Sequence, residues 1–195
     1  MEQIRSFIAI ELPEEIKEEI DRLQTGLKKA DLPNVKWVDT AGIHLTLKFL
    51  GYTTSDTVPS ILVAIEEATA GITPFQLTVG GLGVFPGLGQ ARVAWIGMVG
   101  DVNPLGQLKQ RLDDKLAVLG FATEKRIFAP HLTLARVREQ GTSGERQKLA
   151  SLIASADFTA SRPIRVDNIY LIRSRLTPNG AVYSRIGAVG LQEPK

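Results

Sequence analysis

His44-Leu45-Thr46-Leu47 is repeated as His131-Leu132-Thr133-Leu134, and these two tetrapeptides contain the only histidines of the chain. Given the first copy, the same three residues follow the second histidine by chance about once in a thousand sequences or less. Successive side chains of a β-strand point to opposite faces, so residues two apart share one face, about 6.6 Å from each other. Each stretch therefore predicts a strand with histidine and threonine on one face and leucines on the other. The repeat predicts that the two polar faces meet at one shared site.

The segments around the two motifs repeat as well. An apolar segment at 5–12 precedes a helical pattern that begins at Pro13, and a similar segment at 92–97 precedes a helical pattern near Pro104. We predict one domain over residues 1–195 with an internal repeat, roughly 1–88 and 89–195, folded as two related lobes that face each other across a cleft. The glycine-rich stretch 80–89 has neither a P-loop nor a dinucleotide fingerprint and is interpreted as the loop between the lobes.

The composition is that of a globular domain: 195 residues, 44% hydrophobic, 23% charged, with a formal net charge of +2. A net charge this small does not indicate binding to nucleic acid through overall charge. The chain has no cysteine, which excludes disulfides, a thiolate nucleophile and cysteine zinc sites. Residues 1–5 lack the charged-then-apolar pattern of a signal peptide, and no apolar run reaches about 18 residues. We therefore expect a cytoplasmic protein without a membrane span.

Two histidines with two hydroxyls suit displacement at phosphorus. The unperturbed pKa of imidazole, about 6.5, lies near neutrality, so one ring can accept a proton while the other donates one. Threonine hydroxyls can donate hydrogen bonds to phosphate oxygens. In-line displacement needs a base behind the attacking oxygen and an acid behind the leaving oxygen, on opposite sides of the phosphorus. Two symmetry-related strands can place one histidine on each side. The symmetry itself does not say which histidine is the acid.

The motifs and their surroundings resemble the 2H phosphoesterase superfamily, and within it the bacterial and archaeal RNA 2′,3′-cyclic phosphodiesterases, formerly described as 2′–5′ RNA ligases. The resemblance extends over almost the whole chain and rests on both His-x-Thr-x motifs and on the segments 5–10, 37–38, 44–51, 83–86, 92–95, 130–136 and 174–176 with Gly180 and Tyr183.

The resemblance implies a bilobal α+β fold, with antiparallel-rich sheets flanked by helices and both motifs on central strands of the cleft. It implies metal-independent opening of a terminal 2′,3′-cyclic phosphate to a 2′-phosphate, without a cofactor. His44 would protonate the departing 3′ oxygen, His131 would accept a proton from water, and Thr46 and Thr133 would hold the non-bridging oxygens. The reverse reaction would join a cyclic phosphate to a 5′-hydroxyl and give a 2′–5′ linkage.

Five further residues are candidate contacts to the substrate. Lys48 lies on the His44 face of a regular strand and is expected to meet the RNA backbone or solvent. Arg5 and Arg92, related by the repeat, are candidates for positive charge near the phosphate, with carboxylate pairing as the alternative. Arg126 is a candidate phosphate ligand, and Phe128 is a candidate for base stacking or, alternatively, for core packing.

Other residues are given structural interpretations. Trp37 and Trp95 are predicted to be core residues. Arg136 is predicted to share the Leu132 and Leu134 face and to be structural. No carboxylate lies at ligand spacing from either histidine, so no metal site is predicted.

The expected partners are RNA 3′ ends or nucleoside 2′,3′-cyclic phosphates, with tRNA fragments as one candidate, bound by a monomer. Two alternatives stay open at this point. One is a phosphodiesterase for another small cyclic phosphate or for a 2′–5′ oligonucleotide, and the other is a non-catalytic module that binds RNA 3′ ends.

Overall fold

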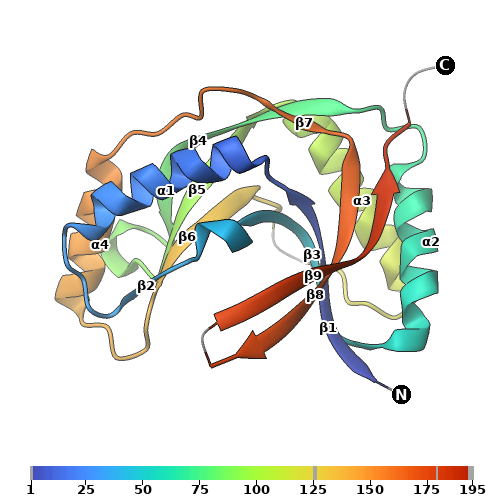
Figure 1. Ribbon diagram of the computed structural model, residues 1–195, viewed down its shortest axis with the longest axis horizontal. Helices are drawn as coiled ribbons and strands as arrows, with labels where there is room; N and C mark the ends of the chain where they lie inside the picture. Colours follow the sequence, from blue (N-terminus) through green and yellow to red (C-terminus); the bar gives the residue numbers. More distant parts are fainter. Residues whose placement is uncertain (1, 125–126, 179, 193–195) are drawn as a thin grey trace.

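The computed structural model describes residues 2–124, 127–178 and 180–192 and has two lobes, each built on an antiparallel sheet (Figure 1). Sheet 1 has the strand order β3-β1-β8-β9, and sheet 2 has the order β2-β6-β5-β4-β7. The two lobes and their antiparallel sheets confirm the predicted bilobal α+β class. The strands of sheet 1 are β1 (Gln3–Glu11), β3 (His44–Thr54), β8 (Asn168–Thr177) and β9 (Gly180–Gly190), and those of sheet 2 are β2 (Val35–Trp37), β4 (Phe75–Phe85), β5 (Val93–Gly100), β6 (His131–Val137) and β7 (Ile164–Val166).

Within the described residues, four α-helices cover the sheets, two on one face of each, and the other faces lie toward the cleft. Helices α2 (Val58–Thr69) and α3 (Val102–Val118) pack together on sheet 1, whereas α1 (Glu14–Lys28) and α4 (Ser143–Ser155) lie on sheet 2 (Figure 1). Local signals define these helices. Acidic residues occupy the first turn of α1, and a capping box between Thr142 and Glu145 begins α4. Among the described residues, no helix is long and apolar enough to cross a membrane.

The two sequence halves exchange elements between the lobes. Strand β4 and helix α1 come from the first half but belong to the lobe of sheet 2, and β8 and α3 come from the second half but belong to the lobe of sheet 1. Each sheet is thus completed by the other half, and one continuous apolar core includes residues of both lobes. The extent of the internal repeat, 1–88 and 89–195, remains a prediction, but neither half forms a lobe alone.

The interpretation of residues 80–89 as a loop is wrong for its first part. Gly80 to Phe85 continue β4, with a bulge between Val79 and Leu82. Gly83 pairs with Trp95 on β5, and a Cβ at Gly83 would lie 2.2 Å from the indole ring. Gly83 therefore makes room for the ring of a neighbouring tryptophan. A glycine-rich composition alone does not distinguish such a strand from a turn.

Both motif strands carry a bulge at the same place. On β3, Leu47 is the extra residue between Thr46 and Lys48, which pair with consecutive residues of β1. On β6, Leu134 is the extra residue between Thr133 and Ala135, which pair with consecutive residues of β5. A bulge reverses the alternation that follows it. Lys48 and Ala135 therefore point into the core, and the following residues, Phe49 and Arg136, turn toward the cleft.

Candidate active site

The two His-x-Thr-x motifs line one cleft of about 1000 Å³ between the sheets. His44 and Thr46 enter it from β3, and His131 and Thr133 enter it from β6. Strand β6 is internal to sheet 2, as expected, but β3 is an edge strand of sheet 1, so the expectation that both motifs lie on central strands is wrong for the first motif. The other lining residues are Arg5, Ser6, Phe7, Val38, Gly42, Ile43, Leu47, Phe49, Gly51, Phe85, Pro86, Val93, Glu124, Ile127, Phe128, Ala129, Arg136, Ser174 and Tyr183.

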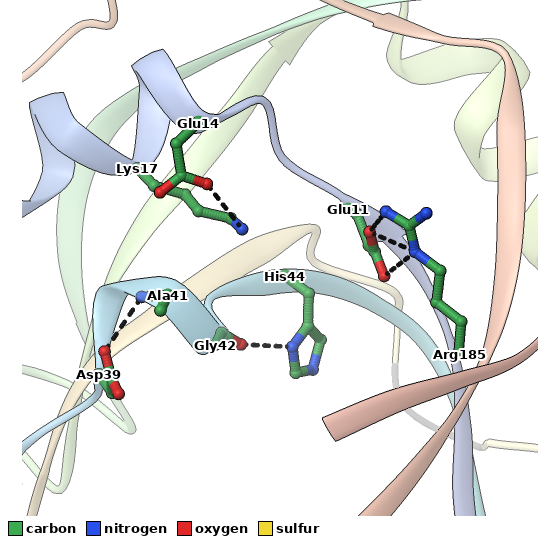
Figure 2. A network of polar contacts seen from close by, with 8 residues as sticks. All are labelled: Glu11, Glu14, Lys17, Asp39, Ala41, Gly42, His44 and Arg185. Carbon is green, nitrogen blue, oxygen red and sulfur yellow. Dashed lines mark hydrogen bonds and ion pairs between the residues drawn. The ribbon is translucent and has the colours of Figure 1, made fainter. Parts of the chain in front are cut away.

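Both imidazoles are held in the same way. Nδ1 of His44 lies 2.7 Å from the carbonyl oxygen of Gly42 (Figure 2), and Nδ1 of His131 lies 2.7 Å from that of Ala129. A carbonyl only accepts hydrogen bonds, so Nδ1 of each ring carries the proton and donates it. Nε2 has no hydrogen-bond partner among the described residues, so it is available as an acceptor in the neutral ring and as a donor in the protonated ring. Each histidine can therefore act as base or acid through Nε2.

Aromatic rings fix the planes of both imidazoles. His44 stacks on Phe7 with ring centroids 4.4 Å apart and meets the edge of Tyr183 at 5.1 Å. His131 meets Phe85 edge-on at 5.0 Å and Trp95 at 6.5 Å. Sequence reasoning gave none of these four residues a place beside a histidine. The prediction that Trp95 belongs to the core is wrong, because its half-buried ring stacks on Phe85 and lies beside His131.

The strand partners of the threonines differ between the two lobes. Thr46 pairs with Ala9 of β1, and Thr133 pairs with Trp95 of β5. Both threonines are half-buried and line the cleft, two residues after their histidine. The arrangement gives each half of the cleft one ring nitrogen and one hydroxyl. This is the shared polar site that the repeated motif predicts.

Arg5 and Arg92 were predicted to occupy matching positions in the two repeats, but the alignment of β1 with β5 is shifted by one residue. The β1 and β5 residues that face the motif threonines, Ala9 and Trp95, are 86 residues apart, whereas the histidines are 87 apart. A one-residue slip moves a side chain to the other face of a strand. Arg5 lines the cleft and donates a hydrogen bond to Ser174 Oγ at 3.3 Å, whereas Arg92 is exposed and lies outside the described cleft lining.

Arg136, predicted to be structural, lines the cleft instead, because the β6 bulge turns it there.

Lys48, predicted to face the substrate or solvent, is buried instead. Its side chain is 2% exposed and pairs with Asp113, so the expectation that it meets RNA or solvent is wrong. Phe128 is half-buried, lines the cleft and also packs against the core. Arg126 lies outside the described residues. The described residues contain no group of three or more histidine or acidic side chains that could hold a metal ion.

The family described as LigT-like phosphoesterase matches residues 10–95 and 96–183 of the chain. The chain belongs to this family. An RNA 2′,3′-cyclic phosphodiesterase of Methanothermobacter thermautotrophicus is 35% identical over 182 residues, which cover 93% of this chain and 96% of that protein. A protein of the same name from Thermotoga maritima is 32% identical over 180 residues, covering 92% of this chain and 91% of that one.

Two solved structures share the fold of this chain. TT0787 of Thermus thermophilus gives a TM-score of 0.80 at 25% identity and covers 98% of this chain and 100% of that chain. Escherichia coli LigT, solved in complex with 3′-AMP, gives a TM-score of 0.78 at 25% identity with the same coverage. The resemblance inferred from the motifs is thus confirmed at the level of the family and the fold.

The surroundings of His44 favour its neutral form in the free protein. Burial lowers the pKa of this imidazole below its ordinary value, and the nearby Lys17 ammonium lowers it further. The carbonyl of Gly42 and the carboxylate of Glu11 oppose this shift but do not cancel it. Figure 2 shows His44 with Lys17 and the Glu11–Arg185 ion pair around it. Arg185 holds the Glu11 carboxylate through two nitrogens, Nε and Nη2.

We expect His44 to titrate below about pH 6.5, the ordinary pKa of imidazole. NMR titration of its ring Cε1–H signal measures this pKa, and a His131→Ala background removes coupling between the two rings. Inorganic phosphate should raise the pKa of His44, since a nearby anion favours the protonated ring. A pKa of 6.5 or higher without phosphate would contradict the effect of burial.

Proposed function

We propose that this protein hydrolyses terminal 2′,3′-cyclic phosphates of RNA to 2′-phosphates by acid–base catalysis with its two histidines. The observation that carries the proposal is the shared cleft, in which two imidazoles with protonated Nδ1 and free Nε2 each stand beside a threonine hydroxyl. The names of the relatives support the choice of substrate. Both proton transfers use imidazole, so the proposed reaction needs no metal ion or cofactor.

In the proposed reaction, Nε2 of His131 takes a proton from water while the water oxygen forms a bond to phosphorus. The bond from phosphorus to the 3′ oxygen breaks, and Nε2 of His44 donates its proton to that oxygen. The products are a 2′-phosphate and a 3′-hydroxyl. Thr46 and Thr133 donate hydrogen bonds to the non-bridging oxygens, and Arg5 and Arg136 add positive charge on opposite walls of the cleft.

The assignment of His44 as the acid is consistent with its environment. A lowered pKa makes the protonated imidazole a stronger acid, and the anionic phosphate in the cleft supplies the charge that keeps the ring protonated before transfer. With a 5′-hydroxyl in place of water, the same groups would transfer its proton to His131, form the bond from the 5′ oxygen to phosphorus and release the 3′ oxygen, which gives a 2′–5′ linkage. We propose this ligation as a secondary activity.

We expect the purified protein to convert adenosine 2′,3′-cyclic phosphate to the 2′-monophosphate in excess EDTA. Chromatography against 2′- and 3′-monophosphate standards identifies which bond breaks, and adenosine 3′,5′-cyclic phosphate is the control without the strained five-membered ring. A 3′-monophosphate product would contradict the proposed leaving group. Binding without turnover would indicate a non-catalytic module for RNA ends. Faster turnover of a 2′–5′ oligonucleotide or of another small cyclic phosphate would change the substrate class.

We further propose that the protein acts as a monomer in the cytoplasm on RNA 3′ ends, with tRNA fragments among them. Support for a monomer comes from the cleft, because one chain provides both motifs and the aromatic residues beside them. Light scattering at the concentrations used for the activity assay tests the monomer directly.

A further inference from the structure

Lys48 is a charged side chain in a position where the strand otherwise buries apolar residues. It lies four residues after His44 on β3 and is 2% exposed. Its Nζ donates one hydrogen bond to Asp113 Oδ1 at 2.6 Å and another to the carbonyl oxygen of Ala122 at 2.6 Å. Lys48 therefore joins β3 to helix α3 and to the segment that follows this helix.

Asp113 bridges two lysines. Its second oxygen, Oδ2, accepts a hydrogen bond from Nζ of Lys109 at 2.5 Å, one turn earlier on α3. Lys109 Nζ also lies 3.6 Å from Glu124 Oε2 and 5.9 Å from the ring centroid of Phe128. The two ammonium groups and two carboxylates balance in charge. Lys48, Asp113 and Lys109 are all buried, whereas the side chain of Glu124 is 45% exposed.

The groups that this network contacts belong to the segment that leads into the second motif. Ala122, Glu124 and Phe128 follow α3, and the described residues between α3 and β6 form no helix or strand. Glu124 and Phe128 line the cleft, and the next residue, Ala129, provides the carbonyl that holds Nδ1 of His131. The carbonyl of Ala129 thus sets the orientation of His131. The two buried lysines are side-chain anchors that tie Ala122, Glu124 and Phe128 to the lobe of the first motif.

Stability alone does not explain these charges. Desolvation of buried ions offsets most of their attraction, and apolar residues of the same volume often stabilise a core at least as well. The equivalent place after the second motif is filled by Ala135, which is fully buried and uncharged. The charged network therefore has a role that is needed on only one side of the cleft. The described residues just before His131, which form no helix or strand, are the part of that side that the network contacts.

We propose that Lys48, Asp113 and Lys109 are positioning residues that hold Ala122, Glu124 and Phe128 in place before β6 and thereby align His131 and the Phe128 wall of the cleft. The proposal rests on the proposed function of the same cleft. Lys109 also pairs with Glu124, so it keeps the negative charge of that carboxylate from facing the anionic substrate alone.

The test uses Lys109→Met and Lys48→Met, which remove the charge but keep an unbranched side chain. Lys115→Met is the matched control, because Lys115 is on the same helix and pairs with Glu67 at the surface, where its side chain is 45% exposed. All variants are assayed on adenosine 2′,3′-cyclic phosphate at a temperature at which circular dichroism shows each of them folded. We expect kcat/KM to fall at least tenfold in Lys109→Met and Lys48→Met and to stay within twofold in Lys115→Met.

NMR of the two histidine rings separates positioning from a general loss of structure. Lys109 contacts neither motif strand in the interactions described, so Lys109→Met should change the ¹⁵N shifts of His131 and leave those of His44 unchanged. Equal changes at both rings, or a kcat/KM equal to that of Lys115→Met, would overturn the proposal. If the unmodified protein does not hydrolyse the substrate, the proposed function fails, whereas the ring shifts still report whether the network positions His131.

Discussion

Replacing His131 with alanine is expected to lower kcat for adenosine 2′,3′-cyclic phosphate by two to four orders of magnitude, and His44→Ala is expected to do the same. A positioned acid or base contributes about 10² to 10⁴ in rate, which corresponds to about 3–5 kcal/mol of barrier. Each ring presents one Nε2 and enters the cleft from a different strand, so one ring cannot serve the attacking and the leaving oxygen at the same time. Steady-state kinetics of the two single variants measures both losses.

The double variant His44→Ala/His131→Ala should lose much less than the product of the two single losses, because groups that act together in one step are not additive. Val99→Ala is the control for substitution as such, since Val99 is an exposed β5 residue outside the cleft lining, and it should keep its activity within twofold. Activity near that of the unmodified protein in either histidine variant would show that the ring concerned does not transfer a proton.

The sequence allowed the prediction of features that depend on local alternation. Histidine and threonine two residues apart share a face in any regular strand, so the doubled motif predicted a common polar site without knowledge of the fold. The bulges were beyond such reasoning, because a bulge is a property of two paired strands, and a single strand gives no sign of it. For this reason the predicted positions of Lys48 and Arg136 were both inverted.

Contacts between distant segments were missed for a similar reason. The four aromatic residues beside the histidines come from β1, β4, β5 and β9, which no spacing rule brings together. The exchange of β4 and β8 between the lobes also depends on pairing across the whole chain. Gly83 does carry one usable signal, since a glycine within a strand often marks the close approach of a neighbouring group, and here that group is the Trp95 ring.

Asp113→Asn is expected to lower the free energy of unfolding by about 3–5 kcal/mol at neutral pH, since it leaves two buried ammonium groups without their shared carboxylate. The asparagine has nearly the same shape, so the loss reports charge and not a cavity. Asp114→Asn is the matched control: Asp114 is the next residue on α3, is exposed and accepts a hydrogen bond only from Gln110 among the described contacts. Its effect should be within about 0.5 kcal/mol. Urea denaturation of both variants measures the difference.

The same pair of variants gives a pH dependence of known sign. Burial by itself raises the pKa of Asp113, but the hydrogen bonds and charges of Lys109 and Lys48 outweigh burial and lower this pKa below its ordinary value. A carboxyl with a lowered pKa in the folded state contributes stability above its unfolded pKa of about 3.9, and this contribution is lost as the pH falls through the folded value. A protonated aspartic acid is uncharged like asparagine, so the unmodified protein and Asp113→Asn should begin to converge in stability below about pH 4 and should be equal once the pH is below the lowered pKa of Asp113. A difference that is small at pH 7, or that persists undiminished in acid, would mean that the carboxylate does not hold the two lysines as the structure shows.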